Sequence, residues 1–190
     1  MEEEYPSYKL IVMGDPGTGK TSIIHRYVHE KFESNVATTV GVSNLHSIVK
    51  VGKMTVDLKI WDTAGQEQYS SLIPMFSRDS NVCLMVADFT RPDTINHLDL
   101  WIERLHKNGE DPPIIVAVNK TDLPGPRPIE SLRTELSTKF KSVLFVSAAT
   151  GSFINELFQS AAKLAIEFKN AKLMESGLPI TNINGSGGCC

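Results

Sequence analysis

The chain has 190 residues, a formal net charge of −3, 41% hydrophobic residues and 22% charged residues. This length suits one well-buried domain and is short for two. The mild acidity argues against a nucleic-acid-binding protein, which normally carries a basic surface, and no apolar run approaches the roughly 20 residues that span a bilayer. The opening residues, MEEEYP, lack the layout of a signal peptide. We therefore expect the protein to fold in the reducing cytosol, where disulfides are rare.

The first part of the chain predicts a strand, a helix and a hairpin. Residues 8–14 (YKLIVMG) are a short apolar run that ends at a glycine loop, which is typical of a buried strand. Residues 20–32 carry apolar side chains at a helical period. Residues 44–51 and 54–61 flank Gly52-Lys53, and the second run alternates apolar with polar residues. These two runs predict an antiparallel pair.

The second part continues the alternation of strands with helices. Residues 81–89 and 113–120 are near-continuous apolar runs, as in strands that are covered on both faces, and Cys83 in the first run is predicted to be a core residue. Between them, a helix is expected to begin at Asp93 and to stop at Gly109. The remaining predicted elements are a helix at 129–140, a strand at 143–148 and a helix whose apolar residues recur at threes and fours over 154–168.

This order predicts an α/β fold with a doubly wound, mostly parallel six-stranded sheet, one antiparallel edge strand and helices on both faces. Ligands of such sheets bind beyond the carboxyl ends of the strands, where the motifs described next all fall. We expect a single domain over residues 1–174. The Gly-, Ser- and Asn-rich residues 175–190 are expected to form a flexible tail.

The run GDPGTGKT, from Gly14 to Thr21, has the spacing of a loop that wraps a polyphosphate, with a strand before it and a helix after it. Its glycines let successive N–H groups point at phosphate oxygens, and the helix start adds a favourable dipole. Lys20 is expected to reach the β- and γ-phosphates, and the Thr21 hydroxyl to ligate Mg²⁺. The fold is thus of the P-loop NTPase type. The expected phosphate-binding residues in this segment are Asp15, Gly17, Thr18, Gly19, Lys20, Thr21 and Ser22.

Two further motifs identify the base as guanine. NKTD, from Asn119 to Asp122, follows a buried strand and lies at the same edge of the sheet as the phosphate loop. The Asp122 carboxylate can accept from both the ring N–H and the exocyclic amine of guanine, an adjacent pair of donors that adenine lacks. SAA, at 147–149, can offer backbone N–H groups to the base oxygen. The candidate guanine-binding residues in these motifs are Asn119, Lys120, Asp122, Ser147, Ala148 and Ala149.

The run WDTAGQE, from Trp61 to Glu67, supplies the residues expected to act on the γ-phosphate. Asp62 ends a predicted strand and is placed to hold Mg²⁺ through water. Gly65 can bring its N–H to the γ-phosphate, and Gln66 can orient an attacking water. We expect Gln66 and Lys20 to be the catalytic residues.

These four motifs, in this order and spacing, resemble the Ras superfamily of small GTPases. The longer run WDTAGQEQYSSLIPMFSRDS and the terminal CC resemble its Rab branch. The resemblance covers about residues 7–170 and the last two residues. It implies a Mg²⁺·GTP/GDP switch in vesicle traffic, with exchange factors, GTPase-activating proteins and effectors as partners. It also implies that Thr39 ligates Mg²⁺ only when GTP is bound, and that Phe32 packs against the guanine.

Three positions depart from the family pattern. In Rab proteins an aromatic residue stands at the position of Asn44 and packs against the aromatic residues that match Trp61 and Phe76. Its replacement by Asn44 either changes which partners bind or is a surface-loop substitution without functional effect. Pro16 fixes its φ and has no N–H to donate, so the rate of hydrolysis is left open in either direction. Ala149 replaces a common lysine. The main alternative function is a GTP-binding module with impaired hydrolysis, and a weaker one is a P-loop kinase.

The last two residues, Cys189 and Cys190, admit three interpretations. A metal site lacks further ligands, and a disulfide between adjacent residues would be strained. Lipidation is favoured, because the pair resembles the Rab geranylgeranylation site. One lipid anchors only marginally without a basic patch, and residues 175–190 contain no Lys or Arg. The resemblance implies prenylation and membrane-extraction machinery as partners, and a place on the cytoplasmic face of an intracellular membrane with a soluble cytosolic pool.

Overall fold

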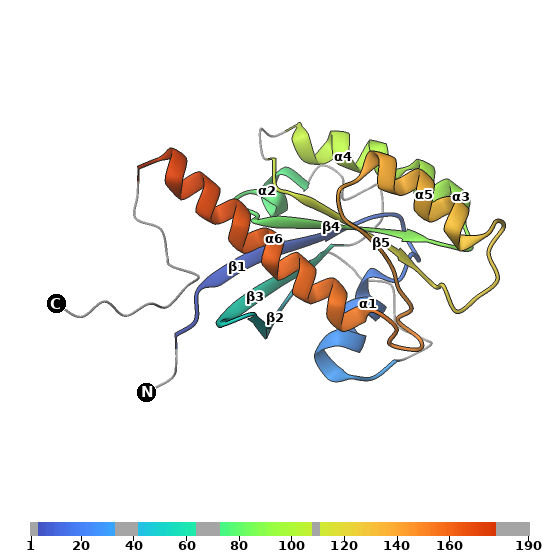
Figure 1. The fold of residues 1–190 in the computed structure, drawn as a ribbon, viewed down its shortest axis with the longest axis horizontal. Helices are drawn as coiled ribbons and strands as arrows, with labels where there is room; N and C mark the ends of the chain where they lie inside the picture. The colour runs from blue at the N-terminus through green and yellow to red at the C-terminus, as the bar shows by residue number, and fades with distance from the viewer. Residues whose placement is uncertain (1–3, 33–41, 64–72, 108–110, 178–190) are drawn as a thin grey trace.

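A central sheet with helices on both faces organises the molecule (Figure 1). The structure is a computed structural model that describes residues 4–32, 42–63, 73–107 and 111–177. The strands are β1 (Ser7–Met13), β2 (Val42–Val51), β3 (Met54–Thr63), β4 (Val82–Asp88), β5 (Ile114–Asn119) and β6 (Val143–Phe145). The helices are α1 (Lys20–His29), α2 (Ile73–Ser77), α3 (Pro92–Asn96), α4 (Leu98–His106), α5 (Ile129–Lys139) and α6 (Ile154–Glu175).

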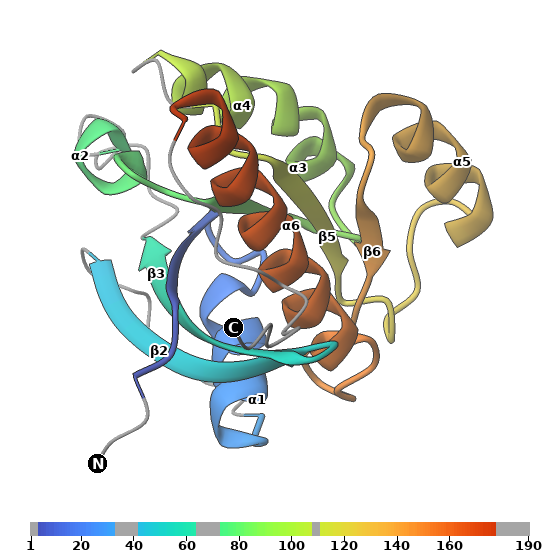
Figure 2. The same cartoon turned by 60° about the vertical axis from the view of Figure 1, so that its left-hand side comes forward.

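These strands form one sheet in the order β2-β3-β1-β4-β5-β6. Strand β2 pairs with β3 in antiparallel register, whereas the pairings of β1 with β3 and β4, and of β5 with β4 and β6, are all parallel. Figure 2 shows β2 and β6 at opposite edges of the sheet. The predicted fold class, a mostly parallel six-stranded sheet with one antiparallel edge strand, is confirmed.

Strand β1 sends alternate side chains into two separate hydrophobic clusters. Leu10 and Val12 belong to the cluster that includes residues of α1 and α6, and Ile11 and Met13 belong to the cluster that includes residues of α4 and α5. This alternation follows from the period of two along a strand. Because both faces are covered, the strand reads as a continuous apolar run. Cys83 on β4 is fully buried, as predicted, and burial raises the pKa of its thiol.

Two predicted elements differ from the observed ones, and one observed helix was not predicted. The expected helix over 93–109 is divided at His97 into α3 and α4; Pro92 occupies its first position, where a proline is well tolerated, and Gly109 lies outside the described residues. The expected strand over 143–148 ends at Phe145. The Val146 N–H still donates to Val118 O of β5, but the Val146 carbonyl accepts from the Thr121 N–H and the Ser147 N–H donates to Ser152 O, which are both in loops. Helix α2 was not predicted at all.

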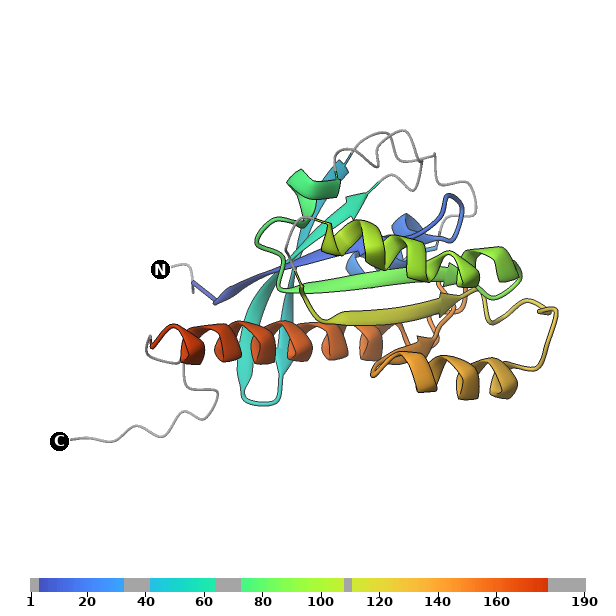
Figure 3. The ribbon, with the colours of Figure 1, turned by 90° about the horizontal axis from the view of Figure 1, so that it is seen from above.

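The edge of the sheet where the parallel strands end carries the β1–α1 loop. In Figure 3, β4 and β5 point toward that loop, whereas the start of β1 and the end of α6 lie at the opposite side of the molecule. The motifs therefore converge at one edge, as expected for this architecture. Among the helices that the structure describes, none has the combined length and apolar character that crossing a bilayer requires.

Candidate nucleotide-binding site

The loop between β1 and α1 is shaped by two glycines that no other residue could replace without rearrangement. Gly14 has a φ of 138°, and a Cβ there would lie 2.2 Å from the Val86 carbonyl oxygen of β4. Gly19 has a φ of 92° and directly precedes α1, and a Cβ there would lie 2.3 Å from the Asn119 side-chain amide. The backbone is thus pressed against both β4 and the NKTD loop, as the glycine-rich motif requires.

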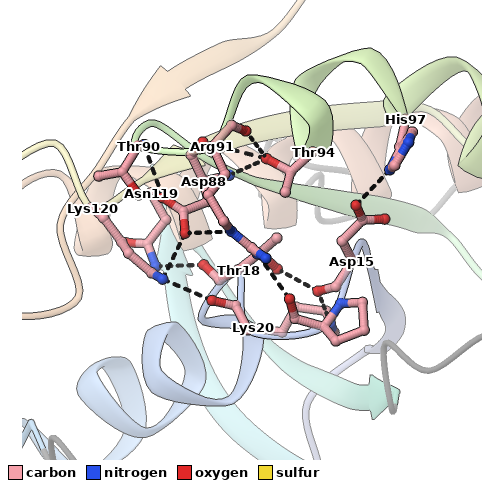
Figure 4. Close-up of polar contacts among 12 residues, drawn as sticks. Asp15, Thr18, Lys20, Asp88, Thr90, Arg91, Thr94, His97, Asn119 and Lys120 are labelled. Atoms are coloured by element: carbon pink, nitrogen blue, oxygen red, sulfur yellow. Dashed lines mark hydrogen bonds and ion pairs between the residues drawn. The ribbon is translucent and has the colours of Figure 1, made fainter. Parts of the chain in front are cut away.

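The carbonyl oxygens of this loop, from Gly14 to Thr18, all accept hydrogen bonds from side chains. Figure 4 shows the side chains of Lys20, Arg91, Asn119 and Lys120 gathered around the loop. In chain order the bonds run from Lys20 Nζ to Gly14 O and Asp15 O (2.8 Å each), from Arg91 Nη2 to Pro16 O (2.8 Å), from Lys120 Nζ to Gly17 O (2.8 Å) and from Asn119 Nδ2 to Thr18 O (2.9 Å). In a trans peptide unit the C=O and N–H groups point in opposite directions. Holding the carbonyls on one side therefore directs N–H groups to the other, which is how such a loop forms an anion cradle.

Lys20 is the buried cation at the base of the cradle, with 6% of its surface exposed. Burial lowers the pKa of its ammonium group to about 8, while Asp62 and Asp15 act in the opposite direction and Arg91 adds to the lowering. A phosphate group beside this ammonium would favour its charged form. Because Lys20 is largely shielded from water, an anionic ligand at this position would stabilise its positive charge.

Thr21 and Asp62, two of the three predicted Mg²⁺ ligands, lie together. The Thr21 hydroxyl donates a 2.6 Å hydrogen bond to Asp62 Oδ2, and the Asp62 side chain is fully buried at the end of β3. One carboxylate and one hydroxyl are hard oxygen donors, and Mg²⁺ typically binds one or two such protein groups together with substrate phosphates. These residues fit the cation, with Asp62 and Thr21 as the groups that would hold it.

The NKTD and SAA segments bond to each other at the same edge of the sheet. The Ser147 hydroxyl donates to Asp122 Oδ1 at 2.6 Å, and the Ala148 N–H donates to Asn119 Oδ1 at 3.1 Å. The Ser147 N–H donates to Ser152 O. The N–H groups of Ser147 and Ala148 are therefore used inside the protein, which leaves that of Ala149 as the backbone donor of this motif for a base oxygen.

The side chain of Asp15 points away from the cradle. Its carboxylate contacts His97 Nδ1 at 2.7 Å, just before α4 (Figure 4). It also accepts a 2.8 Å hydrogen bond from Trp101 Nε1 of α4. A carboxylate aimed into the cradle would repel phosphate. The contribution of Asp15 to phosphate binding, expected from the motif, would therefore come through its backbone.

Sequence reasoning missed Asp88, Arg91, His97 and Trp101. Asp88 is a buried carboxylate at the end of β4, and Lys120 Nζ lies 2.6 Å from its Oδ2. Burial raises the pKa of Asp88, but hydrogen bonds from Lys120 and Thr90 outweigh this effect and bring the pKa below its usual value. A polar residue that ends an apolar run, beyond the carboxyl end of a strand, was the available signal for Asp88. No motif marks the other three.

Several predicted site residues cannot be placed from this structure. Thr39, Gly65, Gln66, Cys189 and Cys190 lie outside the described residues, so their roles remain predictions.

Two more predicted residues lie in α1 and just after it. Ser22 lies in the first turn of α1 and is half-buried. Phe32 follows the end of α1 with 42% of its surface exposed, and an exposed ring beyond α1 is compatible with the expected contact with a base.

The fold and this loop define a P-loop nucleotide-binding protein. A family model described as Ras family matches residues 9–167, which spans every described element from β1 to most of α6. The chain therefore belongs to the Ras family. Its members are small GTP-binding switches that typically hydrolyse GTP and use Mg²⁺.

Proposed function

We propose that this protein is a Rab-like guanine-nucleotide switch that binds Mg²⁺·GTP and Mg²⁺·GDP, hydrolyses GTP slowly and recruits effectors in membrane traffic. The contact between Asp122 and Ser147 carries the proposal. It fixes a carboxylate at the sheet edge that also holds the phosphate loop. Asn119 joins the two parts, since its amide donates to Thr18 O and its oxygen accepts from Ala148 N–H. Base and phosphate recognition are thus built as one unit.

The chemistry asks this chain for position and charge. Lys20 and the inward N–H groups of the loop would neutralise the phosphate oxygens, and Gln66 would orient the attacking water. Mg²⁺, when bound, supplies further charge neutralisation at the β- and γ-phosphates, held by Thr21, Asp62 and, with GTP, Thr39. A nucleotide-dependent arrangement of the segments around Thr39 and Gly65 would make effector affinity depend on the bound nucleotide.

The proposed effector surface includes the open end of the β2–β3 hairpin, where β2 begins and β3 ends, away from the turn at Gly52. Asn44 is exposed on β2 and lies directly opposite Trp61 of β3 in the antiparallel register. The Trp61 ring lies 6.4 Å from that of Phe76, with an interplanar angle of 39°. An aromatic side chain at position 44 would stand beside this pair, so an amide there leaves a more polar surface. We infer that effectors of this protein offer a polar group to Asn44.

Single-turnover GTP decay tests the enzymatic part of the proposal. We expect Mg²⁺-dependent decay on the order of 10⁻⁴ to 10⁻² s⁻¹, because no activating protein supplies an arginine. Decay no faster than in buffer would replace the proposal by the alternative of a GTP-binding module with impaired hydrolysis. Displacement of bound GTP by excess ATP would favour a P-loop kinase and would contradict guanine recognition.

We also propose that Cys189 and Cys190 carry two prenyl groups and place the protein on the cytoplasmic face of an intracellular membrane, with a soluble cytosolic pool. Helix α6 ends at the side of the molecule opposite the phosphate loop (Figure 3). A lipid tether after α6 would therefore leave the nucleotide edge turned away from the membrane. Prenylation and membrane-extraction machinery are the partners that this proposal implies.

Fractionation of cells that express the full chain tests this proposal. The wild-type protein is expected in the membrane pellet with a mass increase of two prenyl groups, and the Cys189→Ser/Cys190→Ser variant in the supernatant without it. Cys83→Ala is the matched control, because Cys83 is buried in the core and its loss should leave the mass increase in place. An unmodified wild-type chain that pellets equally well would contradict lipid anchoring.

A further inference from the structure

Arg91 lies in the connection between β4 and α3 and contacts the phosphate loop from outside the known motifs (Figure 4). Its Nη2 donates a 2.8 Å hydrogen bond to Pro16 O, and its Nε lies 3.2 Å from Asp88 Oδ2. Two different nitrogens of one planar guanidinium therefore join a loop carbonyl to a buried carboxylate. Such a fork is specific to arginine.

The backbone that carries Arg91 is held firmly. The Arg91 N–H donates to Asp88 O at 3.0 Å, and the Arg91 carbonyl accepts from the Thr94 hydroxyl at 2.7 Å and from the Thr94 N–H at 3.1 Å. Asp88 itself accepts from both the N–H and the hydroxyl of Thr90 through Oδ1. The guanidinium thus starts from a fixed point next to the loop, and fewer conformations are lost when it contacts Pro16.

One carboxylate anchors two cations that hold adjacent carbonyls of the loop. Asp88 Oδ2 lies 2.6 Å from Lys120 Nζ and 3.2 Å from Arg91 Nε, and the Asp88 side chain is only 1% exposed. Lys120 holds Gly17 O, and Arg91 holds Pro16 O. The lysine belongs to the base-recognition motif, whereas the arginine belongs to no motif of the chain.

The part of the loop that Arg91 holds lies at the protein surface and includes a glycine in a left-handed conformation. Pro16 and Gly17 are both exposed, and Gly17 has a φ of 73°, a conformation that glycine reaches and leaves easily. The peptide unit between these residues consists of the Pro16 carbonyl and the Gly17 N–H, and the preceding unit has no N–H because Pro16 lacks one. The Gly17 N–H is therefore the donor that this part of the loop can offer to a phosphate. A hydrogen bond on Pro16 O fixes the direction of that donor.

Arg91 also adds to the positive potential at the cradle. Burial is the main cause of the lowered pKa of Lys20, and the positive charge of Arg91 acts in the same direction as a smaller contribution. With 41% of its side chain exposed, Arg91 is partly screened by water. Its main effect should therefore come from the hydrogen bond and not from the long-range field.

We propose that Arg91 is a positioning residue that slows nucleotide release by holding the Pro16–Gly17 peptide unit with its N–H toward the phosphates. This inference rests on the proposed function, because it concerns the release of the nucleotide that the proposed function places at this site. It adds a determinant of nucleotide lifetime that lies outside the phosphate, base and metal motifs.

The test measures release of a fluorescent GDP from the full chain in the presence of Mg²⁺ and excess unlabelled GDP. Arg91→Ala should release GDP about 3- to 10-fold faster than wild type, the effect of losing one partly exposed charge-assisted hydrogen bond. Arg133→Ala is the matched control, since Arg133 is an exposed arginine on α5. Its release rate should equal that of wild type.

Arg91→Lys separates positioning from simple charge balance. Lysine keeps a positive charge beside Asp88 but offers a single ammonium in place of two separate nitrogens. We expect it to restore the melting temperature to the wild-type value while GDP release stays accelerated. Restoration of both, or an Arg91→Ala rate equal to wild type, would overturn the inference and leave the proposed function intact. If Arg91→Ala does not fold, Arg91→Lys alone decides. A wild-type chain that does not retain GDP would instead refute the proposed function.

Discussion

Asp122→Asn is expected to change the base preference of the protein from guanine to xanthine. The Asp122 carboxylate accepts a hydrogen bond from Ser147 on Oδ1 and can accept from two adjacent donors of guanine. An amide at this position offers one acceptor and one donor, which match the ring N–H and the carbonyl that xanthine carries in place of the exocyclic amine. With guanine, the amide oxygen can still accept from the ring N–H, but the negative charge and the second acceptor are lost and the amide N–H₂ faces the exocyclic amine. GDP binding should therefore weaken about 10²- to 10⁴-fold. Competition of labelled GDP by GDP and by xanthosine diphosphate measures the change.

The control for this change is Asp99→Asn, which removes the same charge from an exposed position on α4 beside Lys139. It should bind GDP like wild type. A second variant, Ser147→Ala, removes only the hydroxyl that orients Asp122 and should weaken GDP binding about fivefold. If Asp122→Asn binds GDP as tightly as wild type, the carboxylate does not recognise the base and the assignment of guanine is wrong.

Lys20→Ala is expected to weaken binding of both GDP and GTP by about 10²- to 10³-fold. The ammonium group is buried at the cradle, and its charge-assisted contacts with phosphate have no substitute there. Lys163→Ala, which removes an exposed lysine on α6, is the matched control and should leave affinity unchanged. Calorimetric titration with Mg²⁺·GDP measures both variants, and circular dichroism verifies that each is folded. Affinity within twofold of wild type in Lys20→Ala would show that the loop binds phosphate without this cation.

The pH dependence of binding gives an independent readout of the same residue. Because the pKa of Lys20 is lowered to about 8 by burial, the free protein loses this proton as the pH rises through that value. Phosphate binds the charged form of Lys20, so the pKa of Lys20 is higher in the complex than in the free protein. At pH values above the pKa of the free protein, binding must therefore take up a proton. Affinity should therefore fall about fourfold between about pH 7 and about pH 8.5. The same titration on Lys20→Ala supplies the baseline for the nucleotide itself, and an equal slope in both proteins would remove Lys20 as the cause.

Most of the fold could be predicted from the sequence because its strands are buried on both faces. β1, β4 and β5 show as short, mostly apolar runs, and β3 shows as an alternation of apolar and polar residues after Gly52. The division of the helix at His97 could not be predicted, since the apolar stripe continues through it.

Short motifs in the sequence predicted where the candidate site lies, whereas contacts that join distant segments could not be predicted. The phosphate loop and NKTD were recognised from spacing, and the structure shows Asn119 bonded to Thr18 across 101 positions of the chain. Arg91 and Pro16 are 75 positions apart, and nothing in the sequence near either residue indicates that they touch. Such pairs depend on how the strand ends are brought together, which no local pattern records.

The sharing of Asp88 by Arg91 and Lys120 constrains how this sequence can diverge. Removal of the acid alone would leave two like charges side by side, and removal of one base alone would leave a shielded anion with half of its compensation. A charge-removing replacement at one of these positions is therefore expected to affect the other two side chains as well. Introducing an arginine at the position of Arg91 in a related protein would likewise require residues equivalent to Asp88 and Lys120.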